Sequence, residues 1–247
     1  MNGQGDSMRK LLYLFVFLGV LFFDCALGNQ AWCAGAEVKD VVATLEQGYR
    51  ALNDVQAEFT QRTALASIKK EQRGYGTLMI KKPAGAPAMF RFNYAKPLQQ
   101  IVSNGRTVWF YLPEQKQVMT SDMASMFQGQ NGVTLNYLTG MDNVSKDYSA
   151  SFVGSGLDKK GDFVLQLVPK KKSRVLAKLQ VTVSADAVEK FMKDGRVHDL
   201  FPIVSSVVHD SFGTKTVLEF SKIRVNRGLG NSLFTFRIPQ GVEVIKR

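Results

Sequence analysis

The chain has 247 residues, a formal net charge of +11 from 32 basic and 21 acidic side chains, and a hydrophobic fraction of 45%. Its two cysteines, Cys25 and Cys33, lie near the N-terminus, which excludes a disulfide framework in the rest of the chain and leaves burial as its source of stability. The positive charge favours anionic partners, although plain solubility explains it equally well.

The N-terminal residues have the order of a secretory signal peptide. A basic pair precedes the apolar stretch 11–23, and Ala34-Gly35-Ala36 offers a small-residue cleavage pattern. The apolar stretch is shorter than the roughly 20 residues of a spanning helix. We therefore predict that residues 1–36 are a signal peptide and that residues 37–247 form one exported domain. Because an exported chain rarely meets nucleic acid, we expect an anionic membrane surface, and no nucleic acid, as the target of the basic side chains.

An amphipathic helix over residues 37–53 is the first predicted element of the mature chain. Apolar side chains recur there at the spacing of one helical face, namely Val38, Val41, Val42, Leu45, Tyr49 and Leu52. From Gln56 onward the period changes to two, with Ala57, Phe59 and Gln61 on one face. This change predicts that a strand follows the helix directly.

Short strand candidates separated by turn residues follow along the chain. They are 74–82, 89–94, 99–103, 107–112, 117–121, 148–153, 163–168, 175–184, 201–209, 214–223 and 232–238. The Asn104-Gly105 pair accepts positive φ at both central positions of a turn, so it predicts a tight hairpin. About eleven antiparallel strands with few helices predict a mainly β, α+β fold, a barrel or strongly curved sheet.

Helices are expected at two further places. Two short helical pieces fit residues 122–141, and a helix fits residues 185–194, with Asp186 as its candidate cap and Gly195 as its stop. Such helices can cover one open mouth or the concave face of the predicted sheet.

The most informative pattern is an aromatic strand face. Phe90, Phe92 and Tyr94 share one parity, so one face of their strand is aromatic and must be buried. On the preceding strand Leu78 and Ile80 form a similar apolar row, and Lys82 continues their parity at the strand's end. This predicts an apolar row with a cation at its rim.

The strand 107–112 is apolar on both faces. Trp109 and Tyr111 lie on one side and Phe110 on the other, so cover is needed on both sides. An ordinary core beneath a helix explains these rows as well as a hollow does, because periodicity does not distinguish the two.

Enzyme chemistry is not indicated by this sequence. The two histidines, His198 and His209, are each followed by aspartate, and adjacent residues on a strand point to opposite faces, so neither pair suits a metal or a catalytic triad. No nucleotide-binding or nucleophile motif is present, and no cofactor or metal is expected. The run 170–172 of three lysines either binds anions or is a solvated turn.

The same stretches resemble the LolA-type outer-membrane lipoprotein carrier family, in order along most of the mature chain. The matching stretches are 55–61, 76–83, 90–94 with Pro97 and Gln100, 102–111, 117–118 and 234–244. The resemblance implies an unclosed antiparallel β-barrel with helices forming a lid over an apolar cavity. It also implies a monomeric periplasmic carrier that takes acylated lipoproteins from an inner-membrane ABC transporter to an outer-membrane receptor.

Named residues follow from combining the patterns with the resemblance. The residues expected to line the lipid-binding cavity are Leu78, Ile80, Phe90, Phe92, Tyr94, Trp109, Phe110 and Tyr111. The rim and lid are expected to contain Lys82, Met123, Met126 and Phe127, since methionine repacks around variable shapes. The family usually has arginine at the position of Lys82, and lysine keeps the charge but lacks the fork of donors.

Two other functions stay open at this point. A lipid-sensing regulator of an envelope stress pathway would share the fold but bind a membrane-anchored signalling protein. A secreted hydrolase would need His198 or His209 for its activity.

Overall fold

The structure is a computed structural model that describes residues 35–65, 71–123 and 137–246. Residues 36–247 form one compact unit. The predicted signal peptide lies almost wholly outside the described residues. No helix of the described residues has the length and apolar character needed to span a membrane.

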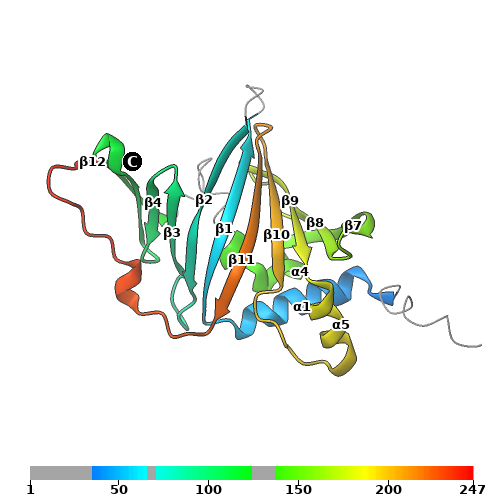
Figure 1. Cartoon of the computed structure of the whole chain (residues 1–247). Helices are drawn as coiled ribbons and strands as arrows, with labels where there is room; N and C mark the ends of the chain where they lie inside the picture. The colour runs from blue at the N-terminus through cyan, green and yellow to red at the C-terminus, as the bar shows by residue number, and fades with distance from the viewer. Residues whose placement is uncertain (1–34, 66–70, 124–136, 247) are drawn as a thin grey trace, which may run out of the picture. The chain divides into compact units, whose positions relative to one another are not determined.

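A single twelve-stranded sheet dominates the unit (Figure 1). Its strands are β1 (Asp54–Ala64), β2 (Glu71–Lys81), β3 (Met89–Lys96), β4 (Gln99–Ser103), β5 (Thr107–Leu112), β6 (Gln117–Asp122), β7 (Tyr148–Leu157), β8 (Phe163–Pro169), β9 (Leu176–Val183), β10 (Ile203–Asp210), β11 (Lys215–Val225) and β12 (Glu243–Lys246). The spatial order is β12-β6-β5-β4-β3-β2-β1-β11-β10-β9-β8-β7. The sheet does not close on itself, so the expected mainly β, open-barrel fold is confirmed with twelve strands instead of about eleven.

The first and eleventh strands meet in the middle of the sheet. Val55 pairs with Val225 and Ala64 with Lys215, and all neighbouring strands run antiparallel except β12, which lies parallel to β6. On β1 the burial alternates as predicted, with Ala57 and Phe59 buried. This parity orients one face of the central strand toward the core.

Among the described residues three α-helices accompany the sheet: α1 (Val38–Ala51), α4 (Val144–Asp147) and α5 (Ala185–Asp194). The backbone N–H of Glu37 donates to the Asp40 carboxylate at 2.8 Å, which caps the start of the predicted first helix. The predicted helix at 185–194 is confirmed, and Gly195 ends it in the left-handed conformation with φ of 69°. Its cap is Ser184, which accepts from the Ala187 N–H, and not Asp186.

The tight hairpin between β4 and β5 is confirmed with a different turn geometry. Only Gly105 has a positive φ, of 90°, while the Asn104 side chain accepts the N–H groups of Arg106 and Thr107 at 3.0 and 2.9 Å. The asparagine therefore stabilises the turn through its side chain instead of adopting a left-handed backbone.

The C-terminal segment differs from the predicted strand at 232–238. It forms a short 3₁₀ helix, η6 (Asn231–Phe234), and pairs with the sheet only at β12. Asp54 fixes the start of this segment, because its carboxylate accepts the N–H groups of Arg227 and Gly228 at 2.8 and 2.9 Å. The segment then crosses the outer face of β2 to β5, where the backbone carbonyl of Leu233 accepts from Arg91 at 3.0 Å. The 232–238 strand prediction is therefore wrong.

Candidate functional site

The inner face of β1 to β3 carries a cluster of aromatic rings. Phe59 lies 5.4 Å from Phe92 and 4.9 Å from Tyr94 between ring centroids, both edge to face, and Phe90 lies 6.3 Å from Phe92. Leu78 belongs to the same core and is fully buried. Such edge-to-face contacts are favourable because ring edges are positive and ring faces negative.

The predicted cavity residues divide between the two faces of the sheet. The structure brings Leu78, Ile80, Phe90, Phe92, Tyr94 and Phe110 to the inner core. Trp109 and Tyr111 are not among them. Their ring centroids lie 6.4 and 5.3 Å from the ring centroid of Phe236 in the C-terminal segment. This is the opposite face of β5, so the structure corrects the expectation that all eight residues line one cavity.

Helix α1 and the segment after residue 136 lie against the inner face as a lid. Val41, Leu45 and Tyr49 of α1 have no exposed surface and join the same core as the strand residues. The lid segment contains two 3₁₀ helices, η4 (Tyr137–Thr139) and η5 (Met141–Asn143), followed by α4. Figure 1 shows α1, α4 and α5 at the lower end of the sheet in that view.

Lys82, just after β2, connects the lid to the sheet. Its amine donates to the backbone carbonyl of Tyr49 at 2.7 Å and to the Asp142 carboxylate at 3.0 Å. Tyr49 lies in the last turn of α1, where carbonyls lack helical partners, and its ring centroid is 5.6 Å from the same amine. We call this set of contacts the lid latch. The predicted rim cation thus contacts both parts of the lid.

Glu46 holds the two parts of the lid together. Its carboxylate accepts the backbone N–H and the hydroxyl of Ser145 at 2.6 and 2.7 Å, and it also accepts from Arg50 at 3.0 Å. The apolar periodicity of α1 does not reveal the role of Glu46, because that pattern concerns only apolar side chains such as Leu45 and Tyr49. A carboxylate on the apolar face of a helix was the available signal, since such a group needs polar partners.

The hydroxyl of Tyr49 is buried and has no hydrogen-bond partner among the described residues. Burial raises the pKa of this phenol well above its ordinary value, and nearby Tyr137 and Asp142 raise it further. A buried hydroxyl without a partner lowers stability by about 1–3 kcal/mol. The closed lid therefore contains one unfavourable polar group beside the latch.

The predicted lid methionines are only partly described. Met123 packs partly buried against the core, and its sulfur accepts from the Ser103 hydroxyl at 3.3 Å. Met126 and Phe127 lie outside the described residues.

Within the described residues neither histidine pairs with the aspartate that follows it in the sequence. His198 contacts Asp194 at 2.8 Å instead of Asp199, whose carboxylate accepts the Phe201 N–H. His209 lies on β10, and its Nε2 is buried with no hydrogen-bond partner in the described part of the chain. Within the described ranges no cluster of three potential metal ligands occurs.

Comparison with known proteins identifies the family. Residues 50–237 match the model of the outer membrane lipoprotein carrier protein LolA. The chain belongs to the LolA family. An outer-membrane lipoprotein carrier protein of Methylobacillus flagellatus is 27% identical over 83% of this chain and 89% of its own length. One from Neisseria meningitidis serogroup B is 28% identical over 96% of this chain and 99% of its own length.

One solved structure that is similar to this chain is a LolA superfamily protein from Nitrosomonas europaea. It superimposes with a TM-score of 0.42 at 14% identity, over 82% of this chain and 99% of that one. The match of residues 50–237 to the family model, and not this superposition, confirms the family resemblance predicted from the sequence.

Proposed function

We propose that residues 37–247 are a periplasmic, non-enzymatic carrier that holds the acyl chains of lipoproteins on the inner face of the half-barrel. Membership of the LolA family supports this function, and the observation that carries it is the aromatic inner face covered by a hydrogen-bonded lid. Residues 1–36 act as the export signal. An inner-membrane ABC transporter supplies the cargo and an outer-membrane receptor takes it.

The cavity residues of this proposal are the inner ones alone, namely Leu78, Ile80, Phe90, Phe92, Tyr94 and Phe110. Their side chains are largely buried when the lid is closed, so cargo must displace α1 and the segment beside it. Opening therefore costs free energy before an acyl chain gains contacts.

This cost makes release feasible. One sixteen-carbon chain removed fully from water gains about 12 kcal/mol, at about 0.8 kcal/mol per methylene. Three such chains would exceed the limit of about 18–21 kcal/mol for non-covalent affinity. Breaking the lid latch and exposing the apolar face of α1 offsets part of the gain, and a receptor with higher affinity can then remove the cargo.

The test compares two neighbouring positions on β5 that face opposite ways. A photo-crosslinking phenylalanine analogue replaces Phe110, on the inner face, or Trp109, on the outer face, in protein loaded with a triacylated lipoprotein. We expect irradiation to link position 110, and not position 109, to the acylated part of the cargo. Equal linking at both positions, or linking at 109 alone, would reject the inner face as the acyl site.

A further inference from the structure

The turn between β10 and β11 presents an exposed aromatic ring. The turn spans residues 211–213 and lies at the upper end of the sheet in Figure 1. Asp210 fixes it, since its carboxylate accepts the N–H groups of Phe212 and Thr214 at 2.9 and 2.7 Å. Phe212 is 55% exposed, the largest value for a large apolar side chain in the described ranges. The backbone thus holds this ring in water.

A strongly basic loop lies beside this turn. The Ser211 N–H donates to the Val175 carbonyl at 3.0 Å, which joins the turn to the loop between β8 and β9. The Ser173 hydroxyl orders that loop by accepting the N–H groups of Val175 and Leu176 at 3.3 and 3.0 Å. We define the basic rim as the exposed cations here: Lys146, Lys170, Lys171, Lys172, Arg174 and Lys215.

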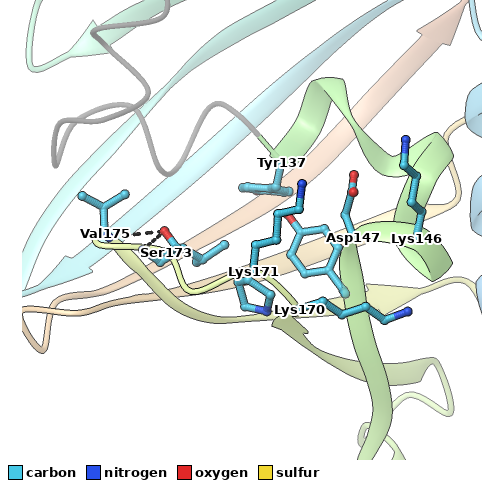
Figure 2. A pocket seen from close by; sticks show the side chains of 10 residues that line it. Tyr137, Lys146, Asp147, Lys170, Lys171, Ser173 and Val175 are labelled. Atoms are coloured by element: carbon cyan, nitrogen blue, oxygen red, sulfur yellow. Dashed lines mark hydrogen bonds between the residues drawn. The ribbon is translucent and has the colours of Figure 1, made fainter.

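Part of the basic rim surrounds a cavity of about 340 Å³. Figure 2 shows Lys146, Lys170 and Lys171 around it, together with Asp147. Tyr148, Val175 and Leu176 also line it, so cationic and apolar side chains meet at this place.

The positive charge of the basic rim is not neutralised by neighbours. Within the described residues none of its six cations forms an ion pair, and Lys170 donates only to the Ser145 carbonyl at 2.7 Å. The nearby carboxylates are Asp147, which lines the cavity, and Asp210, which already accepts the turn amides. The surface therefore has an excess of cations around an exposed ring.

We propose that the basic rim and Phe212 form a docking surface for an anionic lipid bilayer. Cations near a membrane attract its acidic headgroups, and an aromatic ring is favourable at the boundary between headgroups and acyl chains. A protein segment that docks on this chain would need a groove beside the ring to lie in. Phe212 instead stands on a projecting three-residue turn, which suits insertion into a bilayer.

This docking leaves the lid latch free. β11 runs from Lys215 in the basic rim to Val225, which pairs with Val55 near the lid latch, a length of roughly 33 Å at the usual strand rise. Lys215 and the latch thus lie at opposite ends of β11, whereas Lys146 of the basic rim belongs to α4. A carrier held through Phe212 and Lys215 keeps the lid latch exposed to partners, and the electrostatic contact stays reversible.

The experiment is flotation of cargo-free protein with vesicles. We expect binding to phosphatidylcholine vesicles containing about one third phosphatidylglycerol, not to phosphatidylcholine alone, and an affinity loss of at least about tenfold between roughly 0.05 and 0.3 M salt. Phe212→Ser should weaken binding at least about threefold, while Met192→Ser, a 47% exposed residue on α5, should not.

The charge requirement has its own matched pair. Lys171→Glu with Lys172→Glu should weaken vesicle binding at least about tenfold. Lys159→Glu with Lys160→Glu makes the same charge change at the other end of β8 and should have little effect. Equal losses in the two double variants, or no binding by the wild type, would overturn the proposal.

A protein partner is the other outcome that overturns it. Rim-dependent binding to an acidic protein domain, with no binding to vesicles, would assign the surface to that partner. Lipoprotein loading, measured separately, should be unchanged in the Lys171→Glu, Lys172→Glu variant. The two proposals, membrane docking and lipoprotein carriage, can therefore be rejected independently of each other.

Discussion

Among single residues, Lys82 combines two contacts that no other side chain of the lid latch can replace. Lys82→Ala removes the donor to the Tyr49 carbonyl and leaves Asp142 without its cation. Since the lysine side chain is 16% exposed, we expect a loss of about 2–3 kcal/mol in the free energy of unfolding and faster amide exchange in α1.

The neighbouring lysine provides the control for this prediction. Lys81 points to the outer face and donates to the Leu229 carbonyl at 2.7 Å, so Lys81→Ala should leave amide exchange in α1 unchanged. Lys82→Arg should retain the closed lid, because arginine keeps the charge and adds donors. Slow exchange of α1 amides in Lys82→Ala would contradict the latch.

His209 predicts a dependence of stability on pH. Burial of the ring lowers its pKa from the ordinary value of 6.5, and Lys178 and Lys215 lower it further. The folded protein therefore favours the neutral ring. Its contribution to stability is present above the unfolded pKa and is lost as the pH falls from 6.5 through the lower folded pKa.

The measurement is the thermal midpoint as a function of pH. Between about pH 7 and pH 5 we expect a smaller decrease for His209→Gln than for the wild type, because glutamine does not titrate. Parallel curves for the two proteins would show that His209 does not contribute to acid sensitivity.

At the scale of elements, the lid consists of α1 and the η5–α4 segment, joined through Glu46. Glu46→Ala leaves the N–H and hydroxyl of Ser145 without their acceptor, in a place where the carboxylate side chain is only 9% exposed. We expect a loss of about 2–3 kcal/mol in unfolding free energy.

Amide exchange locates this effect. Relative to the wild type, Glu46→Ala should accelerate amide exchange in α4 more than in β1. As a control, Glu58→Ala removes an exposed ion pair with Lys222 and should lower the free energy of unfolding by less than about 1 kcal/mol. Uniform acceleration over the whole sheet would indicate global destabilisation instead of separation of the lid.

The periodicity of single elements was readable from the sequence, but pairing between distant elements was not. The parity of Phe90, Phe92 and Tyr94 predicted a common buried face, because side chains on a strand alternate. Both faces of β5 are apolar, so the pattern alone could not assign Trp109 to the outer face. That assignment depends on Phe236, which lies more than a hundred residues after Trp109 in the sequence.

The same limit applies to the lid. Lys82 was expected at a rim from its parity and from the family pattern, yet its partners in α1 and η5 come from separate parts of the chain. The failed strand at 232–238 has a similar cause. These residues cover the outer face of the sheet, and the chain pairs with the sheet only further on, at β12.

At the scale of the whole molecule, the sheet has two halves that meet at one seam. β1 pairs with β2, its neighbour in sequence, on one side and with β11 on the other. Every other antiparallel pair joins strands that are adjacent in sequence. The seam is therefore the one long-range antiparallel pairing within the described strands.

The seam has a consequence for the order in which the chain folds. The second edge of β1 is paired only when β11 is present, since Val55 pairs with Val225. Contacts this distant in sequence form slowly. A ribosome must finish nearly the entire polypeptide before the central strand can be enclosed. Under the export proposed above, this delay keeps the chain unfolded while residues 1–36 direct it to the membrane, and the half-barrel is completed after the chain has crossed.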